Sequence, residues 1–170
     1  PESHFSWVRP GLSLYGYSKD EQADQVIQSD TDQLKPILSL KTKIVSLRRI
    51  QQGQSVGYGR KYRSSQESTI ATLPIGYGDG ISRFLSGKID CLIQGRRFPI
   101  VGTICMDQCM VDIGNSQFPV GEEVVLLGKQ GSQSIWADEI AERGGTIPYE
   151  ILTALSARLP RYYQESAQGM

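Results

Sequence analysis

The chain has 170 residues, a length that can bury a hydrophobic core without disulfides or metals. Its 18 Lys and Arg balance 18 Asp and Glu, which argues against nucleic acid as a partner and against binding to a membrane surface. No apolar run approaches the roughly 18 residues of a membrane-spanning helix, and three cysteines without an apolar leader predict reduced thiols in a soluble, cytoplasmic protein.

The N-terminal part predicts one strand and a linker. Residues 5 to 15 alternate apolar with small or polar residues on both sides of Arg9-Pro10-Gly11, a pattern typical of a strand that ends in a turn. The sequence enters this strand without an initiator methionine, so we interpret the chain as part of something longer. Residues 17–36 are mostly polar and poor in aromatics, and we predict that they form a linker.

Short strands dominate the sequence after the linker. Glycine-marked turns recur about every ten residues, which predicts a small β barrel or sandwich. At Gln94-Gly95 the sequence predicts a two-residue hairpin turn with glycine at positive φ. The predicted strands are Leu38–Leu47, Thr69–Ile75, Ile89–Ile93, Arg97–Val101, Gln108–Ile113 and Glu123–Leu127.

Two helices are predicted at the C-terminal end. The first covers Ala137–Arg143, has acidic residues in its first turn and stops at Gly144-Gly145. Pro148 suits the first position of a second helix, over Tyr149–Leu159, which Pro160 would end. We therefore expect a mainly β fold with two short C-terminal helices.

Metal and hydrolase chemistry are both disfavoured by the residues present. Cys105 and Cys109 would lie about 13 Å apart on a strand, because each residue advances about 3.3 Å, and this is too far for one zinc ion. His4 is the one histidine and lies at the N-terminal end. A Ser-His-Asp or Cys-His arrangement is therefore hard to assemble, and we predict no metal site.

Five local sequences indicate a chemistry other than metal binding or hydrolysis, because each combines a tight backbone with one reactive side chain. Any one of them is a weak signal, but their order and spacing together resemble the C-terminal half of the fold-type III alanine racemases, which use pyridoxal 5′-phosphate (PLP). The resemblance runs over nearly the whole chain and includes Arg158-Leu-Pro-Arg161. The five stretches are Val8–Gly11, Ser55–Gly59, Pro74–Gly80, Val101–Gln108 and Gly145–Glu150.

The resemblance implies a two-domain parent protein. In that family an N-terminal (β/α)₈ barrel holds PLP on a lysine, and a C-terminal β domain packs against it in a head-to-tail homodimer. Residues 1–16 would then be the last strand of the barrel, and residues 37–170 would be the β domain. The PLP lysine would lie upstream, so the isolated chain is expected to be inactive.

Four residues match positions that bind the cofactor. Arg9 matches the arginine that faces the pyridine nitrogen, where a permanent cation keeps the nitrogen unprotonated. Gly11 and Leu12 match backbone amides near the phosphate, and Tyr149 matches a tyrosine that bonds the phosphate and narrows the pocket around the substrate methyl group. The plainer alternatives are a salt bridge for Arg9 and a simple turn for Gly11.

Two further residues match positions that contact the substrate. Tyr58 matches the second catalytic base, which racemisation requires because the α proton leaves one face of Cα and returns to the other. Met106 matches the residue whose backbone N–H binds the substrate carboxylate. A packing role remains open for both side chains.

The resemblance also extends to an entry corridor for the substrate. Tyr77 and Arg83 match its walls, although a surface turn and a solvated arginine explain them as well. Two positions depart from the family pattern: Thr103 stands where an arginine is frequent, and Gly78 stands where alanine is commoner. These departures concern substrate access.

The resemblance implies that the chain is part of an alanine racemase that interconverts L- and D-alanine with a lysine and a tyrosine as the two bases. It would supply D-alanine for peptidoglycan. A racemase of serine, lysine or a broad range of amino acids is one alternative. A non-catalytic dimerisation or regulatory β domain is the other.

Overall fold

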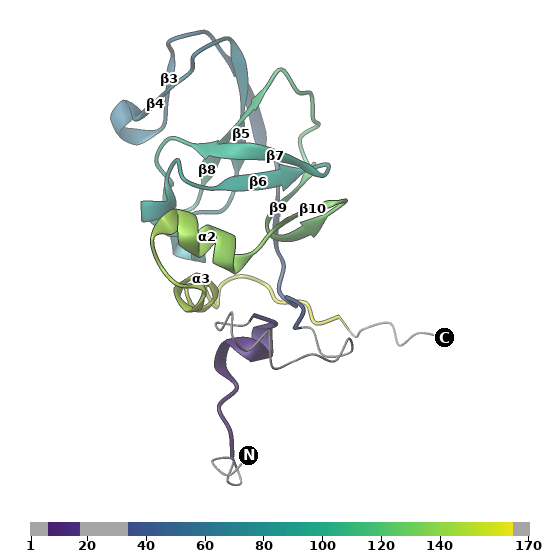
Figure 1. Cartoon of the computed structure of the whole chain (residues 1–170). Coiled ribbons are helices and arrows are strands. Elements are labelled where there is room, and N and C mark those ends of the chain that lie inside the picture. Colours follow the sequence, from purple (N-terminus) through teal and green to yellow (C-terminus); the bar gives the residue numbers. More distant parts are fainter. Residues whose placement is uncertain (1–6, 18–33, 165–170) are drawn as a thin grey trace.

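The computed structural model describes residues 7–17 and 34–164 (Figure 1). In the first of these ranges, residues 7–10 lack regular structure and Gly11–Tyr15 forms a 3₁₀ helix, η1. The predicted strand over residues 5–15 is therefore wrong in its described part: Gly11 and Gly16, at φ 60° and 81°, turn the chain out of an extended path. Most of the predicted linker, residues 18–33, lies outside the described residues.

An eight-stranded antiparallel sheet forms the body of the domain, which confirms the mainly β prediction. Its strands run in the order β1-β9-β6-β7-β8-β5-β2, and β10 pairs with β9. The bounds are Leu40–Lys43 (β1), Ser46–Ile50 (β2), Ser68–Leu73 (β5), Asp90–Ile93 (β6), Arg96–Val101 (β7), Cys109–Gly114 (β8), Glu123–Gln130 (β9) and Gln133–Ile135 (β10).

The sheet curls because its two outermost strands are consecutive in the chain. Only Ile44 and Val45 separate β1 from β2. The Ile44 N–H donates to the Glu122 carbonyl at 3.0 Å, whereas the Val45 N–H donates to the Thr72 carbonyl at 2.9 Å. The single strand predicted over Leu38–Leu47 is thus two strands that close opposite edges of one curled sheet.

The predicted hairpin turn between β6 and β7 is confirmed. Ile93 pairs with Arg96, and the two residues between them, Gln94 and Gly95, have φ of 49° and 71°. Positive φ at both central positions is the feature of a type I′ turn, which matches the twist of the flanking strands.

Both helices are present, but the second is shorter than predicted. Helix α2 covers Ala137–Gly144 and α3 covers Pro148–Thr153, with the proline in its first turn. Beyond α3, the Ser156 N–H donates to the Asp79 carbonyl at 3.0 Å. The chain leaves the helical path to make this contact. Buried residues of both helices, including Ile140 and Leu152, join the main core.

A small hairpin missed by the sequence patterns stands on the sheet. It consists of β3 (Ser55–Val56) and β4 (Tyr62–Arg63), and Figure 1 shows it at the end of the domain opposite α3. Val56 and Tyr62 pack on a second apolar cluster that also contains Ile50, Ile70, Val101 and Met110. The hairpin is therefore fixed to the sheet by the packing of apolar side chains as well as by its covalent connection.

Candidate functional site

Tyr58 lies in the loop between β3 and β4 and projects from the domain. It begins a short 3₁₀ turn, η2 (Tyr58–Arg60), and is 74% exposed. The Thr103 hydroxyl donates to the Tyr58 carbonyl at 3.0 Å. The backbone of the tyrosine is thus anchored while its phenol faces outward, an arrangement suited to a group that acts on a molecule outside the domain.

Gly57 explains how the loop comes so close to the sheet. Its φ is 73°, a value that favours glycine. A Cβ atom there would lie 2.9 Å from the Met110 Cε atom and 3.3 Å from the Thr103 nitrogen. A side chain at position 57 would displace the Met110 methyl group and press on the backbone of Thr103, the residue that anchors Tyr58.

Met106 lies in a two-residue loop that is closed when the Cys105 N–H donates to the Gln108 carbonyl at 2.9 Å. The carbonyls of Cys105 and Met106 accept from the N–H groups of Tyr77 and Gly78, both at 2.9 Å. Because N–H and C=O point in opposite directions across a trans peptide, the N–H groups of Met106 and Asp107 point away from that neighbouring loop. The loop therefore presents backbone donors, as binding of a carboxylate requires.

The loop around Tyr77 packs against this one at backbone distance. It contains the 3₁₀ turn η3 (Tyr77–Asp79). A Cβ atom on Gly76 would overlap the Cys105 carbonyl, and one on Gly78 would lie 2.6 Å from the Arg158 Nη2 atom. Gly78, which stands where the family more often has alanine, thus leaves space for Arg158. Arg158 was not among the predicted site residues.

A hollow of about 650 Å³ brings four of the predicted residues together. Tyr58, Tyr77, Arg83 and Met106 line it, with Thr103, Ile104, Cys105, Asp107 and Gln108. Arg83 comes from a further 3₁₀ turn, η4 (Arg83–Leu85). The phenol, the donor loop and the predicted corridor residues therefore share one surface.

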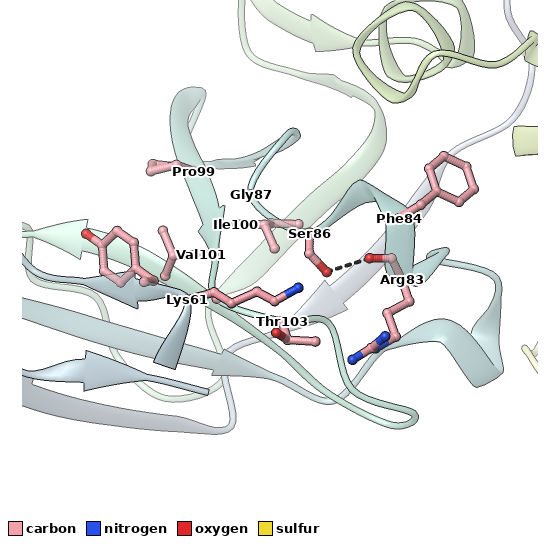
Figure 2. A pocket seen from close by; sticks show the side chains of 11 residues that line it. Lys61, Arg83, Phe84, Ser86, Gly87, Pro99, Ile100, Val101 and Thr103 are labelled. Atoms are coloured by element: carbon pink, nitrogen blue, oxygen red, sulfur yellow. Dashed lines mark hydrogen bonds between the residues drawn. The ribbon is translucent and has the colours of Figure 1, made fainter. Parts of the chain in front are cut away.

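A second hollow, of about 670 Å³, adjoins the first and shares Arg83 and Thr103 with it. Figure 2 shows Lys61 and Arg83 in its walls, with the Ser86 hydroxyl donating to the Arg83 carbonyl at 2.6 Å. The residues that line it include two cations and no acid. The surface next to Tyr58 is therefore locally positive although the chain is neutral.

The predicted cofactor residues form a separate group. The Leu12 N–H donates to the Tyr149 hydroxyl at 3.4 Å, and a Cβ atom on Gly11 would lie 3.1 Å from that oxygen. Arg9 is exposed just before this turn. Figure 1 shows η1 beside α3. Backbone N–H groups and a phenol are donors that suit an anionic oxygen, so this set fits a phosphate.

Buried Tyr17 fixes this group to the domain. Its hydroxyl accepts from the Ala137 N–H at 3.3 Å, and burial raises the pKa of its phenol. The two groups nevertheless stay apart, since the hollow beside Tyr58 is lined by none of Arg9, Gly11, Leu12 and Tyr149.

Cys91 and Cys109 are both buried. Burial raises the pKa of Cys91, and raises that of Cys109 to about 12, so both stay protonated and weakly reactive. Within residues 7–17 and 34–164, no three His, Cys, Asp or Glu side chains are grouped so as to hold a metal ion. Over the same ranges no helix has the length and apolar character needed to cross a membrane.

The fold and this surface define a class of module: a mainly β domain that presents an exposed phenol beside outward backbone N–H groups. Residues 37–163 match the family described as "Alanine racemase, C-terminal domain". The chain therefore belongs to the alanine racemase family, as the sequence motifs predicted.

Relatives show how much of such a protein the chain covers. It is 46% identical over 170 residues to an alanine racemase of Clostridium novyi and 45% identical over 165 residues to one of Halothermothrix orenii. These matches cover 99% and 95% of this chain but 43% and 42% of the relatives. The chain thus spans less than half the length of the relatives it matches.

Solved structures agree with the fold. An alanine racemase from Bacillus anthracis with bound L-Ala-P matches 92% of this chain and 39% of its own, with a TM-score of 0.83 and 38% identity. One from Streptomyces coelicolor A3(2) covers 94% of this chain and 41% of its own, with a TM-score of 0.83 and 34% identity. A Clostridium difficile alanine racemase in complex with cycloserine has a TM-score of 0.74 at 39% identity.

Proposed function

We propose that the chain is the C-terminal part of a PLP-dependent alanine racemase, in which Tyr58 is one of two catalytic bases. The observation that carries this proposal is the shared hollow, where an exposed phenol lies beside a loop with outward N–H groups. One group can exchange a proton and the other can hold a carboxylate. Alanine offers both an α proton and a carboxylate.

The cofactor would be held partly by the other group of residues. Leu12, Gly11 and Tyr149 would contact the phosphate, and Arg9 would face the ring nitrogen. When bound, PLP withdraws electrons from the substrate and so acidifies its α proton. Arg9 would leave the ring nitrogen unprotonated, which limits electron withdrawal and favours return of the proton over transamination.

The substrate contacts follow from the hollow. The Met106 N–H would hold the carboxylate, so that the Cα–H bond faces the Tyr58 hydroxyl on one side. The lysine of the barrel domain would serve the other side. Tyr77 and Arg83 would line the path of entry, and retention of Tyr149 favours alanine over serine.

The separation of the two groups supports a shared site. Tyr58 and Met106 would complete the site of a partner subunit, while Arg9, Gly11, Leu12 and Tyr149 would serve the chain's own barrel. This arrangement requires a head-to-tail homodimer. In a cell, such a protein would work in the cytoplasm and supply D-alanine for peptidoglycan.

The test is hydrogen exchange by the full-length protein in heavy water. The wild type should racemise alanine and exchange the α proton of both enantiomers. Tyr58→Phe should reduce exchange from one enantiomer about 10²- to 10⁴-fold, the usual worth of a general base, and leave exchange from the other largely intact.

Tyr163→Phe is the matched control, because it removes another exposed hydroxyl. Equal modest losses with both enantiomers would remove Tyr58 from the role of base. Racemisation of serine or lysine in preference to alanine would point to a broader enzyme, and a protein without PLP would point to a regulatory domain.

A further inference from the structure

Arg158 joins two loops of the site through one guanidinium group. Its Nε atom donates to Asp79 at 2.8 Å, and its Nη2 atom donates to Asp107 at 2.7 Å. Asp79 belongs to the loop of Tyr77, whereas Asp107 adjoins Met106. Both bonds raise the pKa of the guanidinium, so its charge persists at any ordinary pH.

The two ends of this bridge differ in rigidity. Asp79 is only 7% exposed, and its other carboxylate oxygen accepts from the Gly76 N–H at 2.9 Å. The Asp107 side chain is 66% exposed. A guanidinium is planar and its donors form a fixed fork. When the buried Asp79 carboxylate fixes the position of the guanidinium, the exposed Asp107 carboxylate is therefore held in place as well.

Asp107 lies where its charge matters most. It lines the same hollow as Tyr58, and its neighbour Met106 would bind the substrate carboxylate. Without a counter-charge, the Asp107 carboxylate would repel an anion placed there. Its ion pair with Arg158 offsets this repulsion and holds the Asp107 carboxylate beside the guanidinium.

We propose that Arg158 is a positioning residue for substrate: it holds the Cys105–Gln108 loop in place and neutralises Asp107, so that the Met106 N–H can donate to a carboxylate ligand. This inference rests on the proposed function. It predicts a defect in carboxylate binding that depends on Asp107, which a purely structural role would not produce.

The probe is propionate, which is alanine without its amino group, titrated calorimetrically into the full-length protein. Arg158→Met should raise the Kd for propionate and the KM for alanine about tenfold each, with a smaller change in kcat. Adding Asp107→Asn to Arg158→Met should recover much of this loss, because it removes the unpaired charge. Arg161→Met is the matched control, since Arg161 donates to the Leu155 carbonyl in the same tail.

Two results would overturn the role of Arg158: unchanged Kd and KM in Arg158→Met, or a double variant no better than Arg158→Met alone. If Arg158→Met does not fold, Arg158→Lys decides instead. Lysine keeps the charge but lacks the fork, so a Kd equal to that of the wild type would refute the bridge. A wild type that neither binds propionate nor racemises alanine would overturn the proposed function, and the role of Arg158 with it.

Discussion

The glycines on both sides of Tyr58 have different surroundings. A Cβ atom on Gly57 would crowd Met110 and the Thr103 backbone, whereas the nearest atoms to one on Gly59 would be those of the flexible Lys61 side chain, at 3.8 Å. Both residues have φ above 70°, which side chains rarely adopt. Gly57 therefore sets the distance between the Tyr58 loop and the sheet, while Gly59 serves the turn.

Substitution of Gly57 should reveal this distance. We expect Gly57→Ala to lower kcat/KM of the full-length protein about tenfold or more, because small displacements of a catalytic group are costly. Gly53→Ala is the control, since Gly53 has φ 81° and no atom within 4 Å of its Cβ position. It should cost about 1–2 kcal/mol of unfolding free energy and leave activity nearly unchanged. Equal activities in the two variants would contradict a positional role for Gly57.

Sequence motifs identified four residues that line the hollow, but not the residues that fix the loops around it. Tyr58, Met106, Tyr77 and Arg83 were predicted from local stretches. Asp79 and Arg158 lie 79 residues apart, and Asp107 and Arg158 lie 51 apart. No local pattern signals such pairs. Thr103 appeared only as a departure from the family, yet its hydroxyl anchors Tyr58.

At the scale of elements, the loop of the β3–β4 hairpin contains Tyr58, the predicted catalytic base. Tyr62 in β4 donates its hydroxyl hydrogen to Asp112 in β8. Burial, followed by this carboxylate, raises the pKa of Tyr62 to about 12 from 10.0. The neutral phenol is thus the form that the folded hairpin stabilises.

This shift predicts a dependence on alkaline pH. Because the folded pKa is raised, the stabilisation is complete below about pH 10 and is lost as the pH rises through about 12. Tyr62→Phe should remove that part of the pH dependence and lower the melting temperature at neutral pH. Thermal unfolding from pH 8 to 12 measures both effects, and identical pH profiles for the variant and the wild type would refute the link.

Sequence patterns located most of the longer strands, because alternation and β-branched residues repeat over several positions, but they merged β1 and the start of β2 into one strand. β3, β4 and β10 have only two or three residues each, too few to show a period. The strand expected near the N-terminus failed for another reason. Alternation alone does not make a strand, and glycines at positive φ bend this stretch into η1.

At the scale of the whole molecule, the β3–β4 hairpin that presents Tyr58 lies at the end of the domain opposite η1 and α3, whereas the Tyr77 loop reaches the end of α3. Figure 1 shows η1 and α3 at one end and the β3–β4 hairpin at the other. Under the proposed function, a small substrate that reaches Tyr58 would meet the cofactor held by a second chain. We infer that each chain contributes to two sites, and that each site needs two chains.

Subunit complementation tests this central claim most directly. Two inactive full-length variants would be mixed and refolded together: Tyr58→Phe, and a variant without the PLP lysine of the barrel. If Tyr58 serves the partner's barrel, each mixed dimer contains one intact site, and random mixing should restore about a quarter of wild-type alanine racemisation. If Tyr58 serves its own barrel, every site carries one defect, and a mixture as inactive as its two parents would contradict the shared site.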